Sequence, residues 1–114
     1  MITDLKYLQQ MTQNDSEMMK EMIGLFLIQL DEMRSELGGL IESKNWSELS
    51  RSAHKVKSSA LVMGVAPMVN EMKELELLAK EAKNTEKYPE YYIRFKNMAD
   101  TVDVELKAFL ISLK

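Results

Sequence analysis

Cysteine is absent from this chain of 114 residues, and histidine occurs once, proline twice and glycine four times. Without cysteine the chain can form neither a disulfide nor a thiolate metal site, and a reducing compartment suits it. So few prolines and glycines leave little to interrupt regular structure. Because no stretch alternates polar and apolar residues, the sequence predicts helices rather than strands.

The chain also lacks a large excess of either charge, since it has 15 basic and 18 acidic residues and a net charge of -3. Such a balance gives no general attraction to nucleic acid or to an anionic membrane. The apolar stretches are too short to span a bilayer, and the opening MITDLKYLQQ lacks a signal-peptide pattern. We therefore expect a cytoplasmic protein with a single domain over residues 1–114, which binds neither nucleic acid nor membrane.

Apolar residues recur at helical spacing along nearly the whole chain. The pattern predicts a short helix over residues 3–11 and places Asp15 at the N-cap of a long second helix. Gly38 and Gly39 weaken the last turns of this second helix, by about 1 kcal/mol each relative to alanine. Its expected buried face consists of Met18, Met22, Phe26, Met33, Leu37 and Ile41.

The third helix is predicted to run from Trp46 to about Met63. Asn45 suits its N-cap, Glu48 stands at the third helical position as in a capping box, and Gly64 ends or bends the helix. Its apolar residues are spaced four, three, four and three apart, which is typical of a bundle seam. They are Leu49, Ala53, Val56, Ala60 and Met63.

Pro67 and Pro89 each suit the first turn of a further helix. The expected inward residues of the first of these helices are Met68, Met72, Leu75 and Leu78. Those of the last helix are Tyr92, Phe95, Met98, Val102, Leu106, Phe109 and Leu113. Four amphipathic helices with short loops predict an all-α fold, an antiparallel four-helix bundle with a short N-terminal capping helix.

The single histidine, His54, points about 140° away from the seam of the third helix, and so towards solvent. Nearby lysines favour its neutral, nucleophilic form, and they would offset the charge of an added phosphoryl group, about -1.5 to -2 for a phosphate ester. Small side chains at Ser50 and Ser58 leave room for a second protein. A metal site is not expected, because no other histidine or cysteine is present.

Three functions remain open from these residues. His54 accepts a phosphoryl group, or the bundle is an interaction scaffold in which His54 is incidental, or His54 is a general base in a small enzyme. The third hypothesis lacks a visible second catalytic group, and the sequence contains no phosphate-binding loop for ATP.

The stretch AHKVKSSALVMGV, followed by MVNEMKELELLAK, resembles the histidine-containing phosphotransfer (HPt) domain family. The signature of that family is A-H-x-L-K-G-S, then a glycine ten residues after the histidine, then a leucine-rich helix ending in L-E. Its positions are occupied here by Ala53, His54, Val56, Lys57, Ser59, Gly64, Leu75 and Glu76. The resemblance extends over essentially the whole chain. One departure is Ser58, which stands where the family usually has glycine.

The resemblance implies that His54 is the phosphorylated residue, that Lys57 steadies the phosphoryl oxygens and that Glu76 orients the imidazole. It also implies a docking surface for a partner around the histidine. The residues that we assign to this surface are Ser50, Ser58, Leu61, Gly64 and Val65.

As a member of this family the chain would be a phosphocarrier rather than an enzyme. It would take the phosphoryl group from an aspartyl phosphate on one response-regulator receiver domain and pass it to another, downstream of a hybrid sensor histidine kinase. The receiver domain would bring Mg²⁺, and the bundle itself, expected to be a monomer, would need no cofactor.

Overall fold

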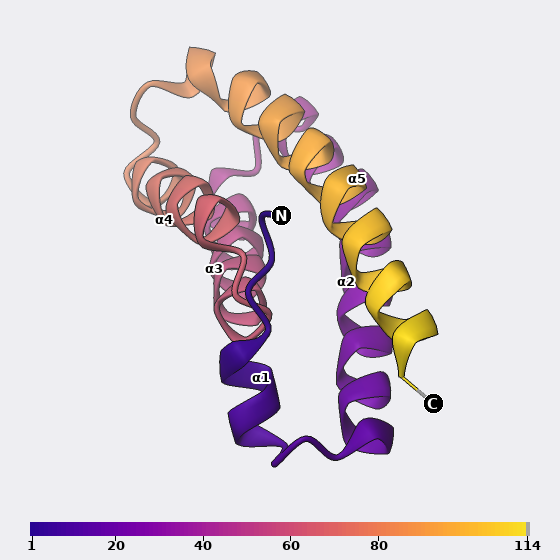
Figure 1. Cartoon of the computed structure of the whole chain (residues 1–114). Coiled ribbons are helices and arrows are strands. Elements are labelled where there is room, and N and C mark those ends of the chain that lie inside the picture. Colours follow the sequence, from indigo (N-terminus) through magenta and orange to yellow (C-terminus); the bar gives the residue numbers. More distant parts are fainter. Residues whose placement is uncertain (114) are drawn as a thin grey trace.

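The computed structural model describes residues 1–113, and four long antiparallel helices dominate it. The elements are α1 (Lys6–Met11), α2 (Ser16–Glu42), α3 (Trp46–Val62), α4 (Ala66–Lys80), the short 3-10 helix η1 (Thr85–Lys87) and α5 (Tyr88–Ser112). In the bundle, α2 and α4 each lie beside both α3 and α5, and α1 extends beyond the C-terminal end of α3 (Figure 1). The bundle measures 45 × 20 × 20 Å, and the predicted all-α architecture is confirmed.

The predicted helix ends follow from local signals in the sequence. Asp15 and Asn45 are N-caps whose side chains each accept a hydrogen bond from the backbone N–H three residues on. Gly64 follows α3 with a φ of +66°, which glycine adopts at no steric cost. Pro67 and Pro89 occupy the first turns of α4 and α5. These boundaries are therefore confirmed.

The buried stripe of α2 differs from the predicted one by a small rotation of the helix. Phe26, Met33 and Leu37 are buried as expected, but Met18 is exposed and its neighbour Met19 is buried instead. The stripe consists of Met19, Ile23, Phe26, Leu30, Met33 and Leu37, while Met22 and Ile41 are half-buried. The assignment of Met18 to the core is thus wrong, because the adjacent methionine fills that place.

On α5, Phe95, Val102 and Leu106 are buried as predicted, whereas Tyr92 is only half-buried. The Tyr92 ring lies over Gly38, where an added Cβ would come within 2.7 Å of it. Gly38 therefore lies within α2 and does not mark its end, and its lack of a side chain leaves room for the Tyr92 ring to pack on the helix. The other predicted inward residues that prove half-buried are Leu78, Met98, Phe109 and Leu113.

The first residues of the chain are not helical, so the predicted start of the first helix at residue 3 is wrong. The backbone N–H groups of Ile2 and Thr3 donate to the Glu105 carboxylate over 3.0 and 2.9 Å, and the Thr3 hydroxyl donates to it over 2.6 Å. Burial alone would raise the pKa of Glu105, but these hydrogen bonds and the terminal amine hold it below its usual value. Because α5 satisfies these donors, the segment stays extended.

A second contact joins this N-terminal segment to the turn between α3 and α4. The Asp4 N–H donates to the Gly64 carbonyl over 3.0 Å. A Cβ at position 64 would overlap the carbonyl of Asp4, so the close approach of the two backbones requires glycine here. The N-terminal segment is thus held at both α5 and the end of α3.

The one tryptophan of the chain, Trp46, begins α3 and contacts the first residue of α5. Its ring meets that of Tyr88 edge-on, with the centroids 4.9 Å apart and the planes at 87°. Tyr88 is fully buried, and its hydroxyl donates to the backbone carbonyl of Lys83 over 2.6 Å. This aromatic pair closes the end of the bundle opposite α1.

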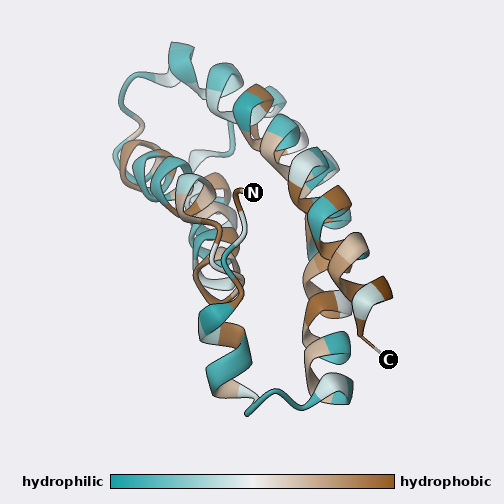
Figure 2. Cartoon of the chain, in the orientation of Figure 1, coloured by the Kyte–Doolittle hydropathy of each residue, from teal (hydrophilic) through white to brown (hydrophobic). Residues whose placement is uncertain are grey.

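Hydrophobic residues recur along the helices between hydrophilic ones, and the connection between α4 and α5 is mostly hydrophilic (Figure 2). The hydrophobic residues gather in one core to which every α-helix contributes. None of the helices within residues 1–113 is both long enough and apolar enough to cross a membrane.

Candidate functional site

His54 lies in the middle of α3, and 57% of its side chain is exposed. The predicted seam residues on the other side of the helix are all buried, namely Leu49, Ala53, Val56, Ala60 and Met63. Their burial fixes the rotation of α3, and this rotation presents the imidazole to solvent as the helical spacing predicted.

The imidazole is held by a carboxylate from the neighbouring helix. Nδ1 of His54 lies 3.0 Å from Oε2 of Glu76 on α4. An ionised carboxylate only accepts hydrogen bonds, so Nδ1 carries the hydrogen and donates it. In the neutral ring the lone pair is then on Nε2. The contact therefore orients the ring and assigns its nucleophilic atom at the same time.

Lys57 is not free to await a phosphoryl group, as the sequence suggested, because Glu76 already binds it. Its Nζ lies 2.8 Å from Oε1 of Glu76, so one carboxylate bridges the lysine and the histidine. Burial alone would raise the pKa of Glu76, but the hydrogen bonds from Lys57 and His54, together with their charges, hold it below its usual value. Glu76 is thus an anion at neutral pH.

The two serines of the expected docking surface differ in their surroundings. The Ser50 hydroxyl donates over 2.9 Å to the backbone carbonyl of Glu76, so this half-buried side chain joins α3 to α4. Ser58 is exposed, and its hydroxyl donates to the His54 carbonyl over 3.1 Å. Ser58 therefore lies open one turn from the imidazole, whereas Ser50 is occupied within the bundle.

The three remaining residues of the expected docking surface also differ in how far they are exposed. Leu61 has 64% of its surface exposed and lies two turns beyond His54 on the same side of α3. Val65 is fully buried, so the expectation that it contacts a partner is wrong: the turn at Gly64 directs it into the core. Gly64 is half-buried, and its lack of a side chain serves the contact with Asp4.

A shallow hollow of about 560 Å³ lies next to the imidazole, towards the start of α3. Besides His54 and Glu76, its lining includes the cations Arg51, Lys55 and Lys80, together with Trp46. Sequence reasoning missed Lys80, because only the packing of α4 on α3 brings it close. Such a hollow suits an anion that approaches the ring. Among residues 1–113, no group of three histidine, cysteine or acidic residues is placed to hold a metal ion.

Comparison with protein-family models matches residues 21–105 to the model described as the Hpt domain. Both the histidine on α3 and the carboxylate on α4 lie within the matched segment. Comparisons with curated proteins and with solved structures find no match.

Proposed function

The chain belongs to the Hpt domain family, and on that premise we propose that His54 is the residue that accepts and returns a phosphoryl group. Hpt domains are phosphocarriers in phosphorelays, and they interact with receiver domains and kinases. The observation that carries the assignment to His54 is its hydrogen bond to Glu76, since this contact leaves Nε2 of an exposed ring as the nucleophile.

In the proposed reaction, Nε2 attacks the phosphorus of an aspartyl phosphate on a receiver domain. The Nε2–phosphorus bond forms while the bond from phosphorus to the aspartyl oxygen breaks, and the receiver recovers its carboxylate. The ring keeps its hydrogen on Nδ1 and becomes positively charged. Glu76 accepts that hydrogen bond throughout, so its negative charge offsets the charge that develops on the ring. No separate base is needed to remove a proton.

Lys57 has a second role in this proposal. Before transfer it is paired with Glu76, and after transfer the phosphoryl oxygens compete for the same ammonium group. Three donors on one flexible side chain allow Lys57 to contact both anions. We infer that this exchange balances the two states in free energy, which is what a carrier that must also give up the group requires.

The remaining parts of the reaction belong to the partners. We propose that the receiver domain supplies Mg²⁺, which neutralises the phosphoryl oxygens during the in-line transfer. The upstream partner would be a hybrid sensor histidine kinase, and a second receiver domain would take the group on. Arg51, Lys55 and Lys80 around the hollow would attract the acidic surface of such a receiver.

The assay that tests this function follows labelled phosphate from a phosphorylated receiver domain to the chain. We expect acid-labile, base-stable label on the wild-type protein and none on His54→Gln. The melting temperature should be nearly unchanged in His54→Gln, because the side chain is exposed and lies outside the core. Label on His54→Gln would place the acceptor elsewhere. An unlabelled wild-type protein would favour the interaction scaffold instead.

A further inference from the structure

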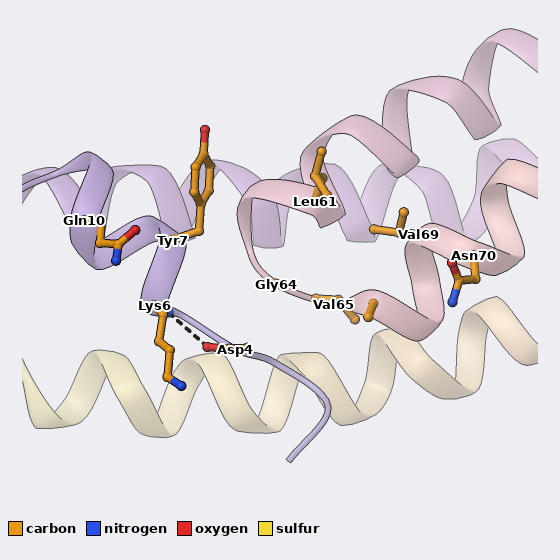
Figure 3. Close-up of a pocket in the computed structure, with 10 residues that line it drawn as sticks. Asp4, Lys6, Tyr7, Gln10, Leu61, Gly64, Val65, Val69 and Asn70 are labelled. Atoms are coloured by element: carbon orange, nitrogen blue, oxygen red, sulfur yellow. Dashed lines mark hydrogen bonds between the residues drawn. The ribbon is translucent and has the colours of Figure 1, made fainter.

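An open pocket of about 440 Å³ lies beyond the C-terminal end of α3, where α1 meets the start of α4. We call it the α1 pocket. In Figure 3 the Tyr7 ring and the Leu61 side chain point to the same side, and the turn at Gly64 passes between them. Ala66 and Val69 add further apolar lining. The pocket is thus mainly apolar and open to solvent.

The wall that α1 contributes is held in place rather than loosely attached. Leu8 is fully buried, and the segment before α1 is bound to Glu105 and to the Gly64 carbonyl. Tyr7 nevertheless keeps 54% of its surface exposed on this fixed helix. A pocket formed in advance binds a side chain at a lower entropic cost than one that must first assemble.

The α1 pocket lies close enough to His54 to be covered by any partner protein that reaches Nε2. A standard protein–protein interface covers about 800 Å² of each partner, which corresponds to a radius of roughly 16 Å around its centre. Leu61 is seven residues after His54, so it lies about 10.5 Å further along α3 and only about 20° around it. A receiver domain centred on the imidazole therefore covers Leu61 and the mouth of the α1 pocket.

The two sides of His54 offer different chemistry to that partner. Towards the start of α3 the surface carries Lys55 and Lys80, together with Arg51, which is paired with Glu48. Towards α1 the surface is apolar, with Tyr7 and Leu61. The acidic site around an aspartyl phosphate complements the first side. At the second side, Tyr7 is of a residue type that often anchors an interface, and Leu61 adds apolar surface beside it.

We propose that the α1 pocket receives an apolar side chain of the receiver domain that docks over His54, and that Tyr7 thereby helps to select among receivers. This inference rests on the proposed phosphotransfer function. It assigns a role to α1, which lies outside the segment matched by the Hpt family model.

The test compares two phosphoryl donors. One is a panel of receiver domains from the same genome, phosphorylated with acetyl phosphate and Mg²⁺, from which the fastest donor to the wild-type protein is chosen. The other is phosphoramidate, a small donor that phosphorylates histidine without docking. Tyr7→Ala enlarges the pocket, and Ala66→Trp fills it from the first turn of α4. Ile93→Ala is the matched control, since Ile93 is equally exposed, at 53%, but lies on α5.

We expect Tyr7→Ala and Ala66→Trp each to raise the KM for the phosphorylated receiver about tenfold, as loss of an interface anchor does. Their reaction with phosphoramidate and their melting temperatures should match those of the wild type and of Ile93→Ala. Tyr7→Ala should also narrow the difference in KM between the chosen receiver and the slower ones.

An unchanged receiver KM in both variants would overturn the proposal. Leu25 on α2 lines a separate hollow between α2 and the end of α3. The proposal would also be overturned if Leu25→Ala raised the receiver KM while Tyr7→Ala did not. Failure of the proposed function has a different signature, because no receiver domain of the panel would then transfer phosphate to His54 of the wild-type protein.

Discussion

Two half-buried carboxylates, Glu76 on α4 and Glu105 on α5, each collect hydrogen bonds from a distant part of the chain. Burial would raise the pKa of both, and hydrogen bonds lower both below the usual value. The donors differ in kind. Glu105 binds two backbone N–H groups and a hydroxyl, whereas Glu76 binds the side chains of His54 and Lys57.

This difference separates a structural contact from a reactive one. Backbone N–H groups neither titrate nor leave, so Glu105 holds the N-terminal segment in one place. The side chains of Lys57 and His54 reach the surface and can exchange partners, so the bonds of Glu76 respond to an arriving anion. The two carboxylates should therefore give opposite results when each is removed.

The largest effect is expected from Glu76→Ala, on phosphotransfer. Without the carboxylate, Nδ1 loses its acceptor and the charge on the phosphorylated ring is not offset, so single-turnover transfer from a receiver should slow ten- to hundredfold, about 1.4–2.7 kcal/mol in the barrier. Glu76→Gln keeps an acceptor for Nδ1, so its transfer rate should lie between those of the wild type and Glu76→Ala. Wild-type transfer rates in both variants would contradict the role of Glu76 in orienting the ring.

Glu105→Ala should instead lower stability and leave the chemistry intact. Loss of the acceptor for three hydrogen bonds should reduce the free energy of unfolding by about 1–2 kcal/mol, and the melting temperature by roughly 4–8 °C. Phosphorylation by phosphoramidate should proceed at the wild-type rate. Glu21→Ala, on the exposed surface of α2, is the control. The comparison fails if Glu105→Ala melts like this control.

A smaller effect is expected from Lys57→Ala, which tests whether the lysine changes partners. Transfer should slow about fivefold, near 1 kcal/mol, and the phosphohistidine should be shorter-lived, because one cation near the phosphoryl group is lost. Lys107→Ala is the matched control, since Lys107 is an exposed lysine on α5 that lines neither the hollow nor the α1 pocket. Equal effects of the two substitutions would show that only the overall charge matters.

The smallest effect concerns pH. Both carboxyls have a folded-state pKa below the value of 4.5 expected in the unfolded chain. Their stabilisation is therefore present above pH 4.5 and is lost as the pH falls towards the folded-state pKa values. Melting temperatures measured from pH 6 to pH 3 should fall less steeply for Glu105→Gln than for the wild type. Parallel curves would mean that the Glu105 contacts do not depend on its charge.

The sequence predicted the features that local signals determine. Caps at Asp15 and Asn45, the turn at Gly64 and the prolines fix where helices begin and end, and the seam of α3 fixes which way His54 points. Such signals act within a few residues of the position they determine, so they can be read without knowledge of the packing.

The errors arose where packing decides. Met18 and Met19 are adjacent and equally apolar, so the sequence pattern does not determine which of them is buried. The packing of α2 in the bundle buries Met19 and leaves Met18 exposed. The extended start of the chain depends on Glu105, more than a hundred residues away. The hydrogen bond between Lys57 and Glu76 likewise joins α3 to α4, and no residue spacing along the chain predicts it.

Because the chain has one tryptophan, the pair formed by Trp46 and Tyr88 gives the bundle a built-in optical probe. The indole lines the same hollow as His54, Arg51 and Lys80, so its emission depends on what fills that hollow. A docked receiver would shield it from water, while unfolding would separate it from Tyr88 and expose it. Partner binding and unfolding can thus be followed on the unmodified protein, with no label near the histidine.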